Sequence, residues 1–156
     1  MRSMPQLSDI FRFTSPPCRY LHWLTSSQAG VRFAQAHDLR VVIKSSGHDY
    51  QGRSTAKNSL LLWTAYFKNI TFAERFIVNG SDHGPAVTVG SGVGLTTLYT
   101  AAKARGKMYV GGTAASVSPA GGYIQGAGHS AFSPHYGLGA DNVLRTYFNV
   151  TSLQLS

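Results

Sequence analysis

Residues 40–54 read RVVIKSSGHDYQGRS, and the fold class is decided around this stretch. Its apolar run, Val41-Val42-Ile43, is too short for a globular helix and predicts a buried strand. Two serines and a glycine follow the strand and lead into His48. A turn of this kind exposes successive backbone N–H groups beside serine hydroxyls, so it predicts a concave site for an anion such as a pyrophosphate.

Helices and strands alternate along the rest of the chain. Thr25-Ser26-Ser27 offers an N-cap for an amphipathic helix that ends near Asp38, and residues 59–63 (SLLLW) predict a second buried strand. We expect both buried strands to be covered on both faces, because their apolar runs are continuous. The remaining expected elements are a weaker strand within 72–78, a turn at 79–85, a strand at 86–90, a helix at 95–105 ended by Gly106, and a strand at 143–150. This order predicts an α+β fold of small sheets flanked by helices.

The two ends of the chain carry weaker signals. Residues 1–24 show no clear period, and Pro16-Pro17 breaks any helix there, so we expect an irregular N-terminal segment. One domain is expected over residues 25–150, and residues 151–156 are expected to form a tail.

A second glycine-rich segment covers residues 109–142, with eight glycines in 34 residues and almost no charge. Its loop from Gly111 to Gly122 is suited to lie against the ligand of the first turn, because glycine lets the backbone approach closely. The plainer alternatives stay open: such a loop is often only a turn, and a His beside an Asp is often only a surface residue. Neither standard phosphate motif is present, and GSGVG at 90–94 is only a weak match.

The composition points to an anionic partner without naming it. The 156 residues carry 14 Lys and Arg against 6 acids, a formal charge of +8. These cations are scattered singly, so we expect no nucleic-acid partner. One cysteine, Cys18, excludes an intrachain disulfide and a four-cysteine zinc site, and we expect no metal.

Membrane insertion and export are not indicated by the sequence. No apolar run is long enough to span a membrane, so no membrane partner is expected. Sequons at Asn69, Asn79 and Asn149 suggest a secreted ancestry, while the N-terminus lacks the apolar core of a signal peptide. The localisation therefore stays open.

Several segments together resemble one family. They are GVRFAQAHDLRVVIKSSGHDYQGRS, SLLLWT, VTVGSGVGLTTLYTAAKARG, GGTAASVSPAGGYIQGAGHS and YGLGADNVL. In this order they are similar to the N-terminal flavin-binding half of FAD-linked oxidoreductases of the vanillyl-alcohol oxidase and berberine-bridge-enzyme type, in the fungal form. The resemblance implies a PCMH-type FAD domain, incomplete at its C-terminus, with FAD as the cofactor.

The resemblance also implies roles for individual residues. His48 matches the residue that is commonly joined covalently to the flavin, and Ser45, Ser46 and Gly47 match the pyrophosphate loop, with Asp49 and Tyr50 beside the anchor. The matching second loop contains Gly112, Thr113, Ser116 and Val117, supported by Gly121 and Gly122, while Gly126, Gly128 and His129 match positions beside the flavin.

Three departures from the family pattern limit what the resemblance implies. Ala114 stands where many relatives have a second flavin-linking cysteine, and Ser118 stands where a glycine is usual. The chain stops at Ser156, where we expect the family to continue into a substrate domain, so we expect a truncated gene product.

Two functions follow as alternatives. The first is an FAD-dependent oxidoreductase, present as its flavin-binding part, which takes hydride from a small alcohol, sugar, amine or activated carbon and is reoxidised by oxygen. The second is a truncated, non-catalytic remnant that acts at most as a binding module. The catalytic residues and the oligomeric state are left open.

Overall fold

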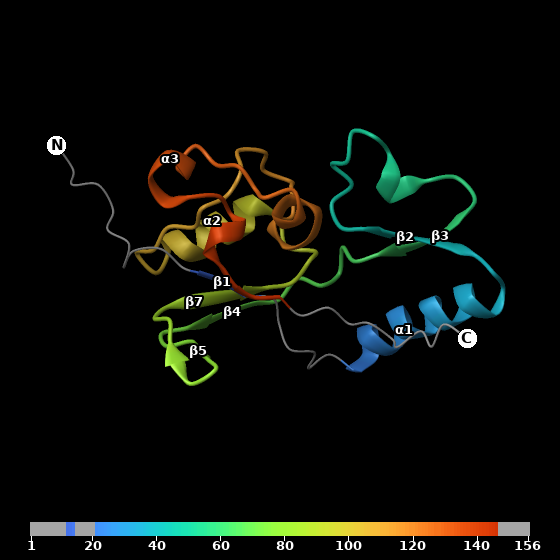
Figure 1. The fold of residues 1–156 in the computed structure, drawn as a ribbon, viewed down its shortest axis with the longest axis horizontal. Helices are drawn as coiled ribbons and strands as arrows, with labels where there is room; N and C mark the ends of the chain where they lie inside the picture. Colours follow the sequence, from blue (N-terminus) through green and yellow to red (C-terminus); the bar gives the residue numbers. More distant parts are fainter. Residues whose placement is uncertain (1–11, 15–20, 147–156) are drawn as a thin grey trace.

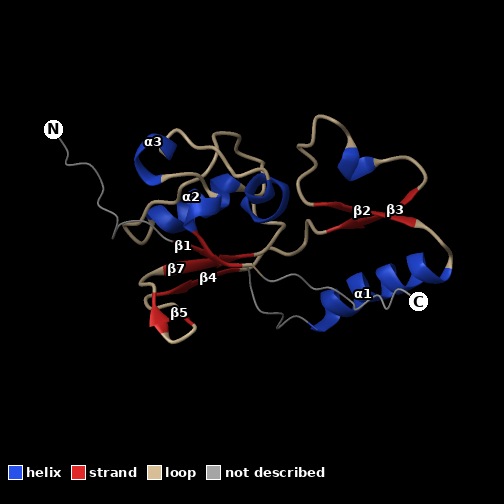
Figure 2. Cartoon of the chain, viewed as in Figure 1, coloured by secondary structure: helices blue, strands red, loops and turns tan. Residues whose placement is uncertain are grey.

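The computed structural model describes residues 12–14 and 21–146, which form two groups of elements (Figures 1 and 2). The larger group is a four-stranded sheet in the order β4 (Ile70–Ala73), β7 (Ala86–Val89), β1 (Arg12–Thr14) and β8 (Val143–Arg145). Strand β1 runs parallel to β7 and β8, and β4 runs antiparallel to β7 with Phe72 opposite Val87. The mixture of helices and small sheets confirms the predicted α+β class.

Helix α2 (Leu95–Lys103) covers one face of this sheet and closes the main hydrophobic core. Val87 and Val89 from β7 and Leu95 and Leu98 from α2 are completely buried. Their burial explains the alternation that predicted β7 and the helical period that predicted α2. As predicted, Gly106 follows the end of this helix, where its N–H donates to the Lys103 carbonyl at 3.0 Å.

The smaller group contains the parallel pair β2 (Arg40–Lys44) and β3 (Ser59–Trp63), at the predicted residues. Helix α1 (Leu21–Ala36) packs on one face, so closely that a Cβ on Gly30 would lie 2.7 Å from Leu62 Cδ2. The expected coverage of both faces is wrong, because Ile43 is 65% exposed and Trp63 is 53% exposed. Among the described residues, this two-stranded sheet has one covering helix rather than two layers.

Outside the two main sheets and the two longer helices, the described residues form short elements joined by irregular segments. The weaker strand expected within 72–78 is divided between the end of β4 and β5 (Ile77–Val78), which forms a hairpin with β6 (Ser81–Asp82). Exposed Asn79, one of the predicted sequons, lies at the tip of this hairpin. The glycine-rich segment contains the interrupted helical turn Pro119–Tyr123, helix α3 (Ser133–Tyr136) and the turn Ala140–Asn142. The turn Arg53–Thr55 lies between β2 and β3.

The N-terminal part differs from the prediction. Residues 12–14 form β1 in the middle of the larger sheet, and α1 begins at Leu21, so the N-cap expected at Thr25-Ser26-Ser27 is wrong. Three-residue strands have too little pattern to stand out in a sequence. The end of the strand expected at 143–150, the sequon at Asn149 and the expected tail at 151–156 lie outside the described residues.

Two features are absent from the described residues. No helix among them has the length and apolar character needed to cross a bilayer. They also bring together no group of three His, Cys, Asp or Glu side chains that could hold a metal ion.

Candidate functional site

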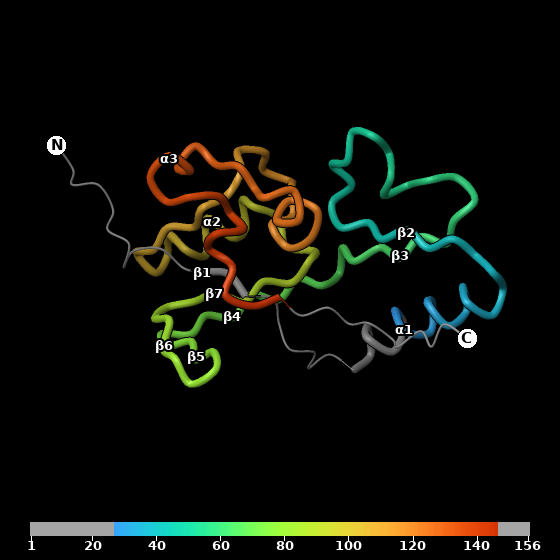
Figure 3. The backbone as a smooth tube through the Cα atoms, in the orientation of Figure 1, coloured from blue at the N-terminus to red at the C-terminus, as the bar shows by residue number. Residues whose placement is uncertain are grey.

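The turn after β2 touches the second glycine-rich loop, although the two lie about 70 residues apart in the sequence (Figure 3). His48 Nε2 lies 2.9 Å from the hydroxyl of Ser116, and the N–H of Ser118 donates to Ser46 Oγ at 3.3 Å. A Cβ placed on Gly121 would lie 3.7 Å from Ser45 Cβ, in ordinary contact. The structure therefore confirms that the two predicted loops lie together.

Hydrogen-bond donors without an acceptor accumulate at this junction. Within the described part of the chain, the backbone N–H groups of Ser46, Gly47 and His48 donate to no other group, and the same is true of Thr113 and Ala114. All five residues are exposed. The neighbouring Ser45 is half-buried, and the neighbouring Gly112 is buried. Unpaired N–H groups beside hydroxyls form a site for an anion, so the donor set fits a diphosphate group.

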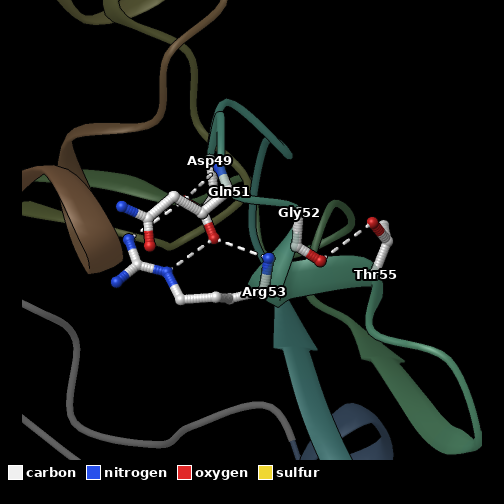
Figure 4. Close-up of polar contacts among 5 residues, drawn as sticks. All are labelled: Asp49, Gln51, Gly52, Arg53 and Thr55. Atoms are coloured by element: carbon white, nitrogen blue, oxygen red, sulfur yellow. Dashed lines mark hydrogen bonds and ion pairs between the residues drawn. The ribbon is translucent and has the colours of Figure 1, made fainter.

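The one carboxylate in the first turn is compensated by a neighbouring guanidinium (Figure 4). Arg53 donates to Asp49 through Nε and Nη2, both at 3.0 Å, and through its backbone N–H at 2.8 Å. The Arg53 side chain, as the first cause, lowers the pKa of Asp49 to about 2. Asp49 is therefore ionised but paired, which reduces its repulsion of an anion at the adjacent N–H groups.

A pocket of about 200 Å³ opens beside the second loop. Four of the predicted site residues line it, and three further residues complete the wall. The predicted four are Gly112, Thr113, Val117 and His129, and the others are Leu95, Ala114 and Tyr123. No residue of the first turn lines this pocket, so the two loops touch at its edge and do not share its walls.

Two tyrosines that the sequence analysis missed fix the walls of this pocket. Tyr99 Oη donates to the Gly112 carbonyl at 2.5 Å, and Tyr123 Oη donates to the His129 carbonyl at 2.8 Å. Burial raises the pKa of Tyr99 to about 12 and raises the pKa of Tyr123 as well. Both phenols therefore stay protonated near neutral pH and remain hydrogen-bond donors. Tyr123 directly follows Gly121-Gly122, which was the only signal of its position.

Other predicted residues lie apart from the junction. The Tyr50 side chain is fully exposed, at 104%, and touches the solvent rather than either loop. Gly126 donates to the Gly122 carbonyl at 2.9 Å within its own turn, and a Cβ on Gly122 would meet no atom within 4 Å. Gly128 is buried against the ring of Tyr123 and so supports the pocket from behind.

The weak phosphate motif at 90–94 has a packing role instead. A Cβ on Gly90 would lie 2.1 Å from the carbonyl oxygen of Phe67, so only glycine fits there. The Gly90 N–H donates to the Asn69 carbonyl at 2.8 Å, and the Gly92 N–H donates to the Phe67 carbonyl at 2.9 Å. The glycines of this turn therefore let its backbone pack against the backbone of residues 67–69.

Comparison with known proteins places this geometry in a family. Residues 25–148 match the model of a FAD binding domain. The FAD-linked oxidoreductase patO of Aspergillus clavatus is 47% identical over 114 residues, which are 73% of this chain and 20% of that protein. The VAO-type flavoprotein oxidase VAO615 of Thermothelomyces thermophilus is 45% identical over 117 residues, which are 75% of this chain and 20% of that protein.

Solved structures of fungal flavoproteins have the same fold over this region. The VAO-type flavoprotein MtVAO615 from Myceliophthora thermophila C1 matches with a TM-score of 0.71 and 42% identity over 76% of this chain and 21% of that chain. MtVAO713 from the same organism matches with a TM-score of 0.70 and 31% identity over 76% of this chain and 22% of that chain. The chain thus spans about a fifth of the length of the curated relatives it matches.

Proposed function

The chain belongs to the FAD binding domain family, so FAD is its cofactor, and we propose that it forms the flavin-binding part of an oxidoreductase acting on a small molecule. The observation that carries this proposal is the hydrogen-bonded junction of the turn after β2 with the second glycine-rich loop. The relatives' names support the oxidoreductase class. Bound FAD would supply the hydride acceptor that no amino-acid side chain provides.

The two loops divide the binding of the cofactor between them. The N–H groups of Ser46, Gly47 and His48 would hold the diphosphate, with the hydroxyl of Ser46 beside them. Arg53 keeps the charge of Asp49 compensated while the diphosphate is bound. The Tyr99 phenol holds the Gly112 carbonyl, and the Tyr123 phenol holds the His129 carbonyl. These two hydrogen bonds fix the shape of the pocket.

His48 is the proposed covalent anchor. Its imidazole is exposed at the junction and already close to the second loop through Ser116. With FAD bound, an imidazole nitrogen of His48 would bond to the 8α carbon of the flavin. That bond would replace one C–H bond of the flavin and the N–H bond of the imidazole, and the two protons and two electrons released would reduce one oxygen molecule to hydrogen peroxide. Ala114 has no nucleophile, so at most one such bond can form.

We propose a substrate only at the level of its chemical class. An alcohol, a sugar, an amine or an activated carbon compound would donate the hydride, and oxygen would accept the electrons. The pocket beside Leu95 and Tyr123 offers an apolar wall and exposed polar groups, a combination common in small-molecule sites.

The experiment is to incubate the purified chain with FAD, denature it in acid and measure flavin fluorescence on the polypeptide. We expect the wild-type chain and the control His135→Ala to retain fluorescence, because His135 is exposed on α3 and does not line the pocket. His48→Ala should bind FAD reversibly and release it in acid. Flavin retained by His48→Ala would place the bond elsewhere. A wild-type chain that binds no FAD, covalently or reversibly, would refute the proposed function.

A further inference from the structure

Ser118 is one of the few buried polar residues of the described chain, with only 4% of its surface exposed. Its hydroxyl lies 2.6 Å from the carbonyl oxygen of Ser91 and 3.4 Å from that of Ala120. The shorter contact is the hydrogen bond, because one hydroxyl has one proton to donate. Ser118 therefore joins the second loop to the turn at 90–94.

The carbonyl of Ser91 accepts a second hydroxyl, from the first turn. Ser45 Oγ donates to it at 2.5 Å. A carbonyl oxygen has two lone pairs, so both serines can bond to it at once. The support is firm, because the N–H groups of Gly90 and Gly92 on either side of Ser91 are bonded to Asn69 and Phe67.

The main chain of Ser118 makes the direct link between the loops. Its N–H donates to Ser46 Oγ at 3.3 Å, while its hydroxyl holds the Ser91 carbonyl. Ser118 is thus bonded to the first turn through its N–H and to the shared acceptor through its hydroxyl. Glycine, which the resemblance leads one to expect here, would keep the first bond and lose the second.

We propose that Ser118 is a positioning residue that fixes the spacing between the two FAD-binding loops before the cofactor arrives. This inference rests on the proposed function, because it assigns the spacing to the binding of a diphosphate. Donors that are already in place lose less conformational entropy when the ligand binds, so a fixed spacing raises affinity without a new contact to the ligand. A hydroxyl buried at one shared acceptor is suited to this role, since its bond is not exchanged with water.

The test uses the whole 156-residue chain and measures ADP binding by calorimetry, since ADP carries the diphosphate without the flavin. Ser118→Ala and Ser118→Gly should each weaken ADP binding about five- to tenfold, the factor for one lost hydrogen bond. Ser118→Thr keeps a hydroxyl and should recover most of the affinity. The control is Ser130→Ala, because Ser130 is also buried, at 8%, but its bonds stay within residues 130–133.

A second measurement reads the loop spacing without any ligand. The NMR signals of the His48 imidazole report its contact with Ser116, so they should shift in Ser118→Ala and stay unchanged in Ser130→Ala. A loss of stability alone would not move these signals in the folded chain.

The outcomes separate this inference from the proposed function. Unchanged ADP affinity or an unchanged His48 spectrum in folded Ser118→Ala overturns the role of Ser118 while the FAD site stands. An equal loss of affinity in Ser130→Ala also overturns it, because the effect would then be general. A wild-type chain that binds neither ADP nor FAD refutes the proposed function, and the role of Ser118 with it.

Discussion

Replacing Gly128 by alanine tests the support of the pocket, because two separate costs are predicted at this position. Gly128 has φ +71, a left-handed conformation that costs a residue with a Cβ about 1–2 kcal/mol. The new Cβ would also lie 2.8 Å from Tyr123 Cε1, closer than real Cβ contacts, and 3.1 Å from Tyr123 Cζ, closer than most of them. Pushing a packed ring aside costs about 1–3 kcal/mol. The sum is about 2–5 kcal/mol, a large part of the roughly 5–15 kcal/mol that stabilises a domain.

Gly106→Ala is the matched control. Gly106 has φ +66, and a Cβ placed on it would meet nothing within 4 Å, so only the strain of about 1–2 kcal/mol applies. Urea unfolding followed by circular dichroism gives the free energy of unfolding of each variant. In a background of Tyr123→Leu, which removes the ring, the cost of Gly128→Ala should fall to that of Gly106→Ala. Equal costs of the two alanines in the wild-type background would refute the contact with Tyr123.

Three further predictions concern charge and core packing. Arg53 lowers the pKa of Asp49 from 3.8 to about 2, so the contribution of this pair to stability is complete above pH 4 and is lost as the pH falls through about 2. Carbon NMR of Arg53→Gln should show the pKa of Asp49 raised toward 3.8. The pKa of Tyr99 is raised by burial from 10.0 to about 12, so stability should be complete below pH 10 and fall as the pH rises through about 12; Tyr99→Phe should remove this late phase from an ultraviolet titration. Leu98→Ala should reduce the free energy of unfolding by about 2–5 kcal/mol, because the side chain is completely buried, whereas Leu138→Ala, at a residue 37% exposed, should change it by less than about 1 kcal/mol in the same urea assay.

The parts of the fold with a strong local pattern were predictable from sequence. Strands β2 and β3 occupy the predicted residues, and β7 and α2 lie within one or two residues of their predicted ends. Strand β1 was missed because three residues carry no period, and its place is set by pairing with β7 and β8 far along the chain. Continuous apolar runs also suggested two-sided burial for β2 and β3, but composition cannot reveal how many layers cover a sheet.

The candidate site was predictable only as two loops. Turns rich in glycine and serine indicated where an anion would bind. The structure brings His48 of the first turn within 2.9 Å of Ser116 in the second loop. The phenols behind the pocket were hidden because Tyr99 faces the core side of α2 in a pattern that any helix shows. The role of Ser118 was hidden for a related reason, since the acceptor that it shares with Ser45 is a backbone carbonyl, and a sequence does not show where a carbonyl points.

The two loops differ in how well the elements beneath them are packed, and this difference determines which interactions fix the site. Among the residues whose burial the structure describes, Ala34 is the only buried apolar one from α1, β2 or β3, while β7 and α2 contribute most of the core. The turn after β2 therefore gains little order from the packing of its own sheet. Its position depends on hydrogen bonds to the better-packed group, through Ser45 to the Ser91 carbonyl and through Ser46 and His48 to the second loop. Each such bond contributes only about 1 kcal/mol, so the junction is stable as a set and loosens when single members are removed. A ligand that bonds to both loops adds to that set, which couples cofactor binding to the order of the whole β2–β3 unit.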